Sequence, residues 1–80
     1  MIRKKPILKF VLCIDAGDYP VSLEPRKVYQ IIPDAPAATK GFVRVVDESG
    51  ADFLFPSRLF VAVELSQAAA KAILASHQAA

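Results

Sequence analysis

The chain alternates short apolar runs with short turn-forming segments. The apolar runs are rich in β-branched and aromatic residues and are bounded by charges, glycine or proline, which is typical of strands. Proline has no backbone N–H to donate, so it tends to stand at strand ends. The pattern predicts five strands, at residues 9–15, 26–32, 42–47, 51–56 and 60–64.

The segments between the apolar runs predict loops and turns. Residues 15–20 and 34–41 are expected to be loops, because they combine proline with glycine and other turn-forming residues. Residues 48–50 (ESG) predict a tight hairpin turn, since Gly50 can take positive φ without steric cost. Residues 56–59 predict one short turn that can take 3₁₀ geometry.

The pattern changes over residues 65–80, which are rich in alanine and predict a helix with Ser66 as its N-cap. Ala70, Ile73 and Leu74 fall on one face at helical spacing. An isolated helix of this length is marginal in water, so these three residues are expected to form an interface. Two partners stay open for that interface, the rest of this chain or a second copy.

Polar residues within the strands predict which side chains point inward, because successive side chains alternate between faces. With Gln30, Arg44 and Asp52 outward, the inward residues are Tyr29, Ile31, Val43, Val45, Phe53 and Phe55. The outer face then keeps Val28, Ile32, Phe42, Val46 and Leu54. A freely solvated small barrel should show less outer apolar surface, so we expect the C-terminal helix or a dimer interface to cover part of it.

Two parts of the chain resemble the Src-homology-3-like (SH3-like) barrel. Residues 12–16 (LCIDA) and 23–29 (LEPRKVY) resemble its first two strands. Gly50 and residues 55–60 (FPSRLF) resemble its hairpin, 3₁₀ turn and last strand. The segment 23–60 is also similar to small bacterial and phage proteins, most of them without an assigned function.

The resemblance implies a mainly β fold, a five-stranded antiparallel SH3-like barrel with a C-terminal α-helix. The expected organisation is a basic N-terminal arm at 1–8, the barrel at 9–64 and the alanine-rich helix at 65–80. It also implies that Leu59 or Phe60 lies close to the site where family members grip proline-rich ligands. Because this chain has no tryptophan for an aromatic groove, the resemblance carries over the architecture rather than that binding.

Size and composition agree with one small folded domain. The chain has 80 residues, of which 54% are hydrophobic and 22% charged. A core this small leaves little net stability, so a docked helix or a second subunit is expected to add to it. The single cysteine, Cys13, excludes an intrachain disulfide, and no apolar run approaches the ~18–20 residues of a membrane span.

The net charge of +2 is unevenly distributed. Arg3, Lys4, Lys5 and Lys9 make the start of the chain basic, and the rest is slightly acidic. Such an arm either contacts phosphates or is a solvated tail. The apolar run 10–14 after it is shorter than the ~7–15 residues of a signal peptide, so we expect a cytoplasmic protein with no membrane partner.

Little in the sequence points to catalysis. Cys13 lies within an apolar strand, where burial makes a thiol inert, although a pair with His77 would be the alternative. His77 near a helix end is expected to be solvated rather than a ligand, and the three glycines form no phosphate loop. We therefore expect no enzyme, no catalytic residue, no metal site and no cofactor.

The function expected is a noncatalytic interaction module that binds a protein segment or its own copy. The alternative is a nucleic-acid-binding accessory barrel, which would use basic and aromatic residues. The candidate binding surface consists of Tyr19, Lys27, Phe42, Arg44, Arg58 and Leu59. The competing interpretation is that Lys27 and Arg44 are ordinary outward residues that face Glu24 and Asp52 across the sheet.

Overall fold

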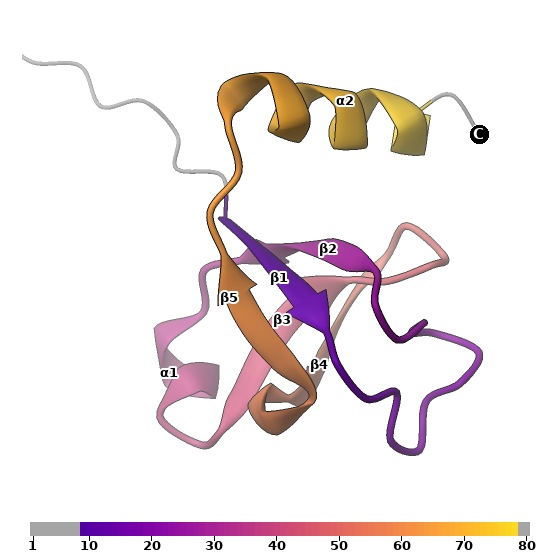
Figure 1. Ribbon diagram of the computed structural model, residues 1–80. Coiled ribbons are helices and arrows are strands. Elements are labelled where there is room, and N and C mark those ends of the chain that lie inside the picture. The colour runs from indigo at the N-terminus through magenta and orange to yellow at the C-terminus, as the bar shows by residue number, and fades with distance from the viewer. Residues whose placement is uncertain (1–8, 79–80) are drawn as a thin grey trace, which may run out of the picture.

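The computed structural model describes residues 9–78, and the expected basic arm at 1–8 lies outside them. Five strands and two α-helices follow one another, with a 3₁₀ turn before the last strand (Figure 1). The order is β1 (Lys9–Cys13), β2 (Val28–Ile32), α1 (Ala35–Ala38), β3 (Phe42–Val46), β4 (Asp52–Pro56), η1 (Ser57–Leu59), β5 (Phe60–Val63) and α2 (Gln67–Gln78).

The five strands form one antiparallel sheet in the order β4-β3-β2-β1-β5. In Figure 1 the sheet curls, so that β5 and β1 lie in front of β3 and β4. No pairing joins β4 to β5, so the sheet is open and these two strands are its edges. The mainly β fold class with a C-terminal helix is confirmed, and the arrangement is compatible with an SH3-like fold without closing into a barrel.

The core lies on the concave face of the curled sheet. It consists of Val11, Cys13, Leu23, Tyr29, Val45, Phe55, Leu59 and Phe60, with Ile31 and Val43 packed against it. Five of the six residues expected to point inward are therefore in the core or packed against it. Phe53 is the exception, with 51% of its side chain exposed. It lies on an edge strand beside the hairpin turn, where no further strand covers it.

The expectation of a plain loop at 34–41 is wrong, because α1 forms there. The Asp34 carboxylate accepts the backbone N–H of Ala37 at 3.1 Å and so acts as the N-cap. Pro36 stands in the first turn, where no backbone N–H is needed. Gly41 follows the helix with φ of +83°, a conformation that glycine adopts at no steric cost. The same proline and glycine that suggest a loop thus also begin and end a single helical turn.

The C-terminal helix α2 begins as expected. The Ser66 hydroxyl accepts the backbone N–H of Ala69 at 3.0 Å, which confirms the N-cap. Ala70 is buried, whereas Ile73 and Leu74 are half-buried. In Figure 1, α2 lies beyond the end of the sheet where β1 begins, away from the core. The side chain of His77 lies outside what the structure describes.

Candidate interaction surface

A contiguous apolar patch covers the outer face of the three strands β2, β1 and β5. Leu12 is the centre of this patch, since it pairs with Val28 on one side and with Val61 on the other. Val63 lies next to Val61 on the same face, and Ile14 continues the face beyond the end of β1. These five residues, Leu12, Ile14, Val28, Val61 and Val63, form what we call the outer apolar patch.

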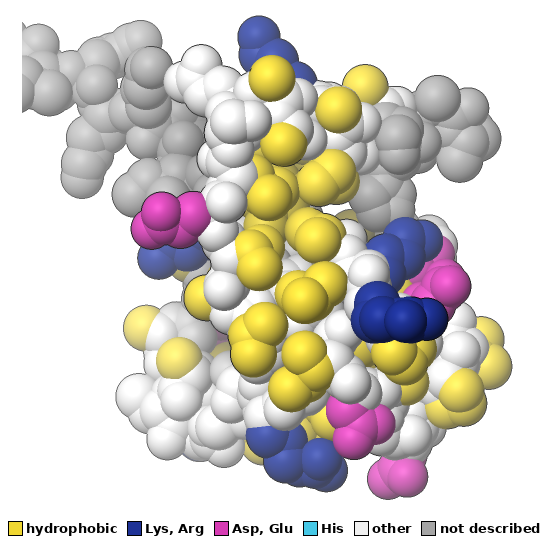
Figure 2. All heavy atoms as spheres, viewed as in Figure 1, with side chains coloured by type: hydrophobic (Ala, Val, Ile, Leu, Met, Phe, Trp, Pro, Cys, Tyr) yellow, Lys and Arg dark blue, Asp and Glu magenta, His cyan; other side chains and the backbone are white. Residues whose placement is uncertain are grey.

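The outer apolar patch is open to solvent. Ile14 is 52% exposed and Val61 is 43% exposed, and the other three members are half-buried. Figure 2 shows hydrophobic side chains running in a stripe from α2 down over the front of the sheet, with charged groups around its margins. Water is therefore in contact with a row of aliphatic side chains that spans three paired strands.

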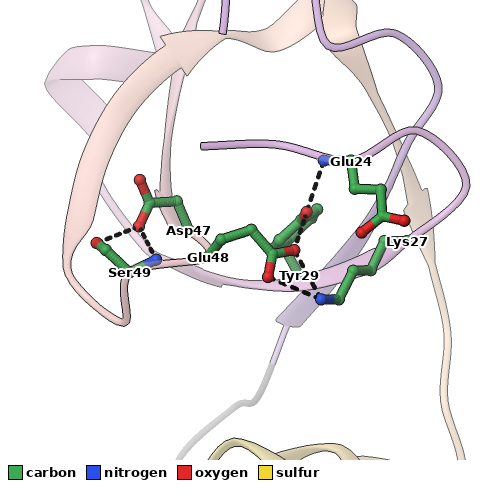
Figure 3. Close-up of polar contacts among 6 residues, drawn as sticks. All are labelled: Glu24, Lys27, Tyr29, Asp47, Glu48 and Ser49. Carbon is green, nitrogen blue, oxygen red and sulfur yellow. Dashed lines mark hydrogen bonds and ion pairs between the residues drawn. The ribbon is translucent and has the colours of Figure 1, made fainter. Parts of the chain in front are cut away.

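The polar residues beside this patch bond to one another (Figure 3). Lys27 Nζ lies 2.7 Å from Glu48 Oε2, and the Tyr29 hydroxyl donates to the same oxygen at 2.5 Å. The Tyr29 hydroxyl also accepts the backbone N–H of Glu24 at 2.7 Å. Lys27 thus pairs with Glu48 from the hairpin turn and not with the neighbouring Glu24, which corrects the expectation. The cluster ties the segment before β2 to the β3–β4 turn.

Burial sets the protonation of Tyr29. Desolvation raises the pKa of its hydroxyl well above the ordinary value of 10.0, and the hydrogen bond to the Glu48 carboxylate raises it further. The hydroxyl therefore stays protonated and donates. Its part is structural, since it is held between a backbone N–H and a carboxylate that already has a lysine partner.

The hairpin turn beside this cluster is also fixed by a buried carboxylate. One oxygen of Asp47 accepts the backbone N–H of Ser49 at 2.8 Å and its hydroxyl at 2.5 Å (Figure 3). Gly50 has φ of +87°, as the turn prediction for residues 48–50 requires. The Glu48 backbone N–H donates to the Ser22 carbonyl at 3.1 Å, which holds the turn against the preceding loop.

Arg44 is held by two carboxylates. Its Nε lies 2.9 Å from Asp34 and its Nη1 lies 3.1 Å from Asp52, so the expected pairing with Asp52 is confirmed. The N–H of Ala37 and then the Arg44 guanidinium lower the pKa of Asp34. Arg44 therefore links the start of α1 to β3 and β4. Phe42, on the same face of β3, is exposed.

The remaining residues of the predicted surface are Tyr19, Arg58 and Leu59, which lie in the loop after β1 and on η1. Tyr19 packs edge-on against Phe55, with ring centroids 5.1 Å apart, and keeps one part exposed. Arg58 is exposed on η1. Leu59 is fully buried in the core, so its expected place on the binding surface is wrong. The 3₁₀ turn directs Leu59 inward toward Gly17, while it leaves Arg58 in solvent.

The structure thus does not make one surface of the six predicted residues, because Leu59 is in the core, although Phe42 and Arg44 share a face of β3. None of the six belongs to the outer apolar patch. Val28 is the one member of the patch that the sequence pattern predicts above as an outer apolar residue. The signal for the others lies in the alternation along β1 and β5: once Cys13 and Phe60 point inward, Leu12 and Val61 must point outward.

Cys13 is part of the core. Its thiol is fully buried and donates to the Asp15 carbonyl oxygen at 3.4 Å, and burial raises its pKa. This agrees with the interpretation as a core cysteine, since a reactive thiolate needs exposure and a lowered pKa. Among the side chains that the structure describes, no three of His, Cys, Asp or Glu gather as metal ligands would.

Comparison with known proteins identifies no relative of this chain: no protein-family model, curated protein or solved structure matches it. In the described part of the chain, neither helix is both long and apolar enough to cross a membrane.

Proposed function

We propose that this chain is a noncatalytic interaction module that uses the outer apolar patch to bind a protein, either a segment of another chain or a second copy. The observation that carries the proposal is an uncharged aliphatic row, Val28–Leu12–Val61, left open across three paired strands. Soluble monomers rarely leave contiguous apolar surface uncovered, and such surface commonly marks a site of association. Charged side chains lie beside the row, as at the polar rim of an interface (Figure 2).

The proposal includes an SH3-like fold for the sheet. The strand order β4-β3-β2-β1-β5 and the 3₁₀ turn between β4 and β5 support it. The binding surface would nevertheless differ from the one that the resemblance implies, because Leu59 is buried and the aliphatic row lies on the outer face. We place the module in the cytoplasm, which agrees with a single buried thiol in a chain that cannot form an internal disulfide.

Nucleic-acid binding is the second candidate, and the arrangement of charges favours it less. Two of the three basic residues proposed to contact phosphates are in ion pairs, Lys27 with Glu48 and Arg44 with Asp34 and Asp52. Binding to phosphates would first have to break these pairs. The outer apolar patch itself offers no charge to a phosphate backbone.

The test uses the nitrogen-15-labelled full chain and a peptide selected against it from a random library. We expect amide shifts at Leu12, Val28 and Val61 on adding the peptide, and loss of binding in Val61→Lys. Val21→Lys is the matched control, since Val21 lies in a loop and is already 90% exposed. An amide spectrum of each variant confirms that it is folded.

Two results would contradict the proposal. One is Val61→Lys binding the peptide as tightly as the unaltered chain does. The other is shifts on a mixed oligonucleotide at low salt that disappear at high salt, with no response to any selected peptide. The second result would establish the nucleic-acid alternative instead.

A further inference from the structure

The strand β4 is an edge of the sheet, and no described strand pairs with it on the side away from β3. It pairs with β3 alone, in the register that places Val45 opposite Phe53 and Arg44 opposite Leu54. Two bonds at the ends of this ladder fix its phase: Asp47 N–H donates to the Ala51 carbonyl, and Ser57 N–H donates to the Gly41 carbonyl.

Hydrogen-bonded pairs recur at every second residue in an antiparallel ladder. The backbone groups that point toward β3 are therefore those of residues 51, 53, 55 and 57. Asp52 and Leu54 therefore direct their N–H and C=O groups away from the sheet. No described backbone group bonds to them there. Pro56 ends the strand and has no N–H to offer.

Two neighbouring side chains of β4 are open on opposite faces, although Phe55 is buried. Phe53 is 51% exposed and Leu54, on the opposite face, is 43% exposed. The one charged residue of the strand, Asp52, is already paired with Arg44. Proteins usually protect such an edge with lysines, a bulge or a covering segment. Here the described residues supply only Pro56, at one end.

The opposite edge, β5, is less suited to receive another strand. Its first residue, Phe60, already donates its N–H to the Ser57 carbonyl. The bond from the Ile14 N–H to the Leu59 carbonyl fixes the phase of this ladder, so that Phe60 and Ala62 direct their backbone groups outward. Within this strand only Ala62 keeps both groups for a partner. The edge then ends at the charged Glu64.

We propose that β4 pairs antiparallel with β4 of a second copy, so that two five-stranded sheets join into one across a two-fold axis. This surface is separate from the outer apolar patch. The occupant is a second copy because the strand is complementary to itself. With the axis at Phe53, Asp52 of one copy lies opposite Leu54 of the other. Their outward N–H and C=O groups then form about four hydrogen bonds, two for each pair.

Side-chain placement favours the same register. The two Phe53 rings meet across the axis in a close, non-hydrogen-bonded position, where aromatic pairs stabilise a sheet. Each Asp52 faces a leucine, so no carboxylates oppose each other. Moving the axis to Leu54 would place Asp52 opposite Pro56, whose missing N–H would leave the Asp52 carbonyl without a donor.

The first experiment is analytical ultracentrifugation of the full chain from micromolar to millimolar concentration. We expect a monomer–dimer equilibrium in the unaltered chain. Leu54→Pro should raise the dimer dissociation constant by roughly tenfold or more, because each copy loses one intermolecular hydrogen bond. Its own fold should persist, since the Leu54 N–H does not bond to β3. Leu54→Glu is the second variant, which places a carboxylate opposite Asp52 of the other copy without altering the backbone and should also weaken the dimer, because like charges opposed across a strand pair repel.

The second experiment tests the register by cross-linking. In Phe53→Cys the two new thiols would lie opposite each other, within the reach of a disulfide. Oxidised glutathione should therefore link the chains rapidly. Val21→Cys is the matched control on an exposed loop, and the buried Cys13 stays inert in both.

Three results would overturn the inference. One is a chain that stays monomeric at every concentration, even if it binds a foreign extended peptide along β4. Another is a dimer that is lost in Val61→Lys but kept in both Leu54 variants; this would place self-association on the outer apolar patch and support the proposed function alone. The third is cross-linking of Phe53→Cys no faster than that of Val21→Cys. A dimer kept in Val61→Lys and weakened in both Leu54 variants supports the inference, whatever the outcome for the patch.

Discussion

Tyr29→Phe removes one hydroxyl from the polar cluster and leaves the buried ring in place. The hydroxyl accepts the Glu24 N–H at 2.7 Å and donates to the Glu48 carboxylate at 2.5 Å. A hydrogen bond between neutral groups contributes about 1 kcal/mol to stability, and one to a charged group about 1.5–3 kcal/mol. Glu48 keeps Lys27, and water reaches the exposed Glu24. We therefore expect a loss of about 2 kcal/mol at neutral pH, below the simple sum.

The pH dependence of stability distinguishes this mechanism from a loss of packing. The pKa of Tyr29 is raised in the folded state above its ordinary value of 10.0. Above about pH 10 the unfolded chain releases this proton while the folded chain keeps it, so stability falls with a slope of up to about 1.4 kcal/mol per pH unit. Below that pH the contribution of the hydroxyl is fully present. The advantage of the unaltered chain over Tyr29→Phe should therefore shrink as pH rises above 10.

The assay is urea unfolding of both chains at pH 7 and at steps between pH 9 and 11. Taking the difference between the two chains removes the pH effects of all groups that the two chains share. In a chain that carries Glu48→Gln, the free energy of unfolding lost through Tyr29→Phe should be smaller, because the hydroxyl then donates to an uncharged acceptor. Equal stability of the two chains at pH 7, or a gap that stays constant through pH 11, would refute the structural role given to the hydroxyl.

Three further predictions concern backbone strain and the buried thiol. Gly17→Ala should cost about 1–3 kcal/mol in urea unfolding, because φ is +56° and the new Cβ would lie 3.2 Å from a methyl group of Leu59; an unchanged midpoint would contradict this. Arg26 has φ of +70°, so Arg26→Gly should be neutral or stabilising by up to about 1 kcal/mol, and Arg26→Val should be clearly destabilising. Cys13 should react with a thiol reagent only as fast as the chain opens, so that adding urea accelerates labelling; rapid labelling of the folded chain would show that the thiol is accessible.

The strands and turns could be predicted from sequence because their signals are local. Alternation along a strand and glycine at a hairpin turn need only neighbouring residues, and they place β1 to β5 within a few residues of their observed bounds. α1 was missed because Asp34, Pro36 and Gly41 are as typical of a loop as of a one-turn helix. The bond from Arg44 to Asp34 adds a contact from ten residues away, which a local pattern does not contain.

The candidate site was less predictable, because exposure depends on which strands end up at an edge. Alternation correctly places Phe53 on the same side as Phe55, yet only Phe55 is covered. Lys27 could be expected to pair with Glu24 nearby, whereas the fold brings Glu48 from 21 residues away. The resemblance to SH3-like barrels predicts Leu59 near a ligand site, whereas in this chain Leu59 is part of the core.

The ion pairs within the fold limit which charged side chains can contact a partner. Lys27 and Arg44 are in ion pairs, and these pairs fix loops and α1 in place. The two contacts proposed above rest on aliphatic side chains of the outer face and on backbone groups along β4. Association through either should therefore be nearly insensitive to sodium chloride and strengthened by sulfate, which favours burial of apolar surface. Binding driven by phosphate contacts would instead weaken steeply as salt rises. The salt dependence of dimerisation and of peptide binding thus tests, in one series, whether burial or charge governs recognition by this chain.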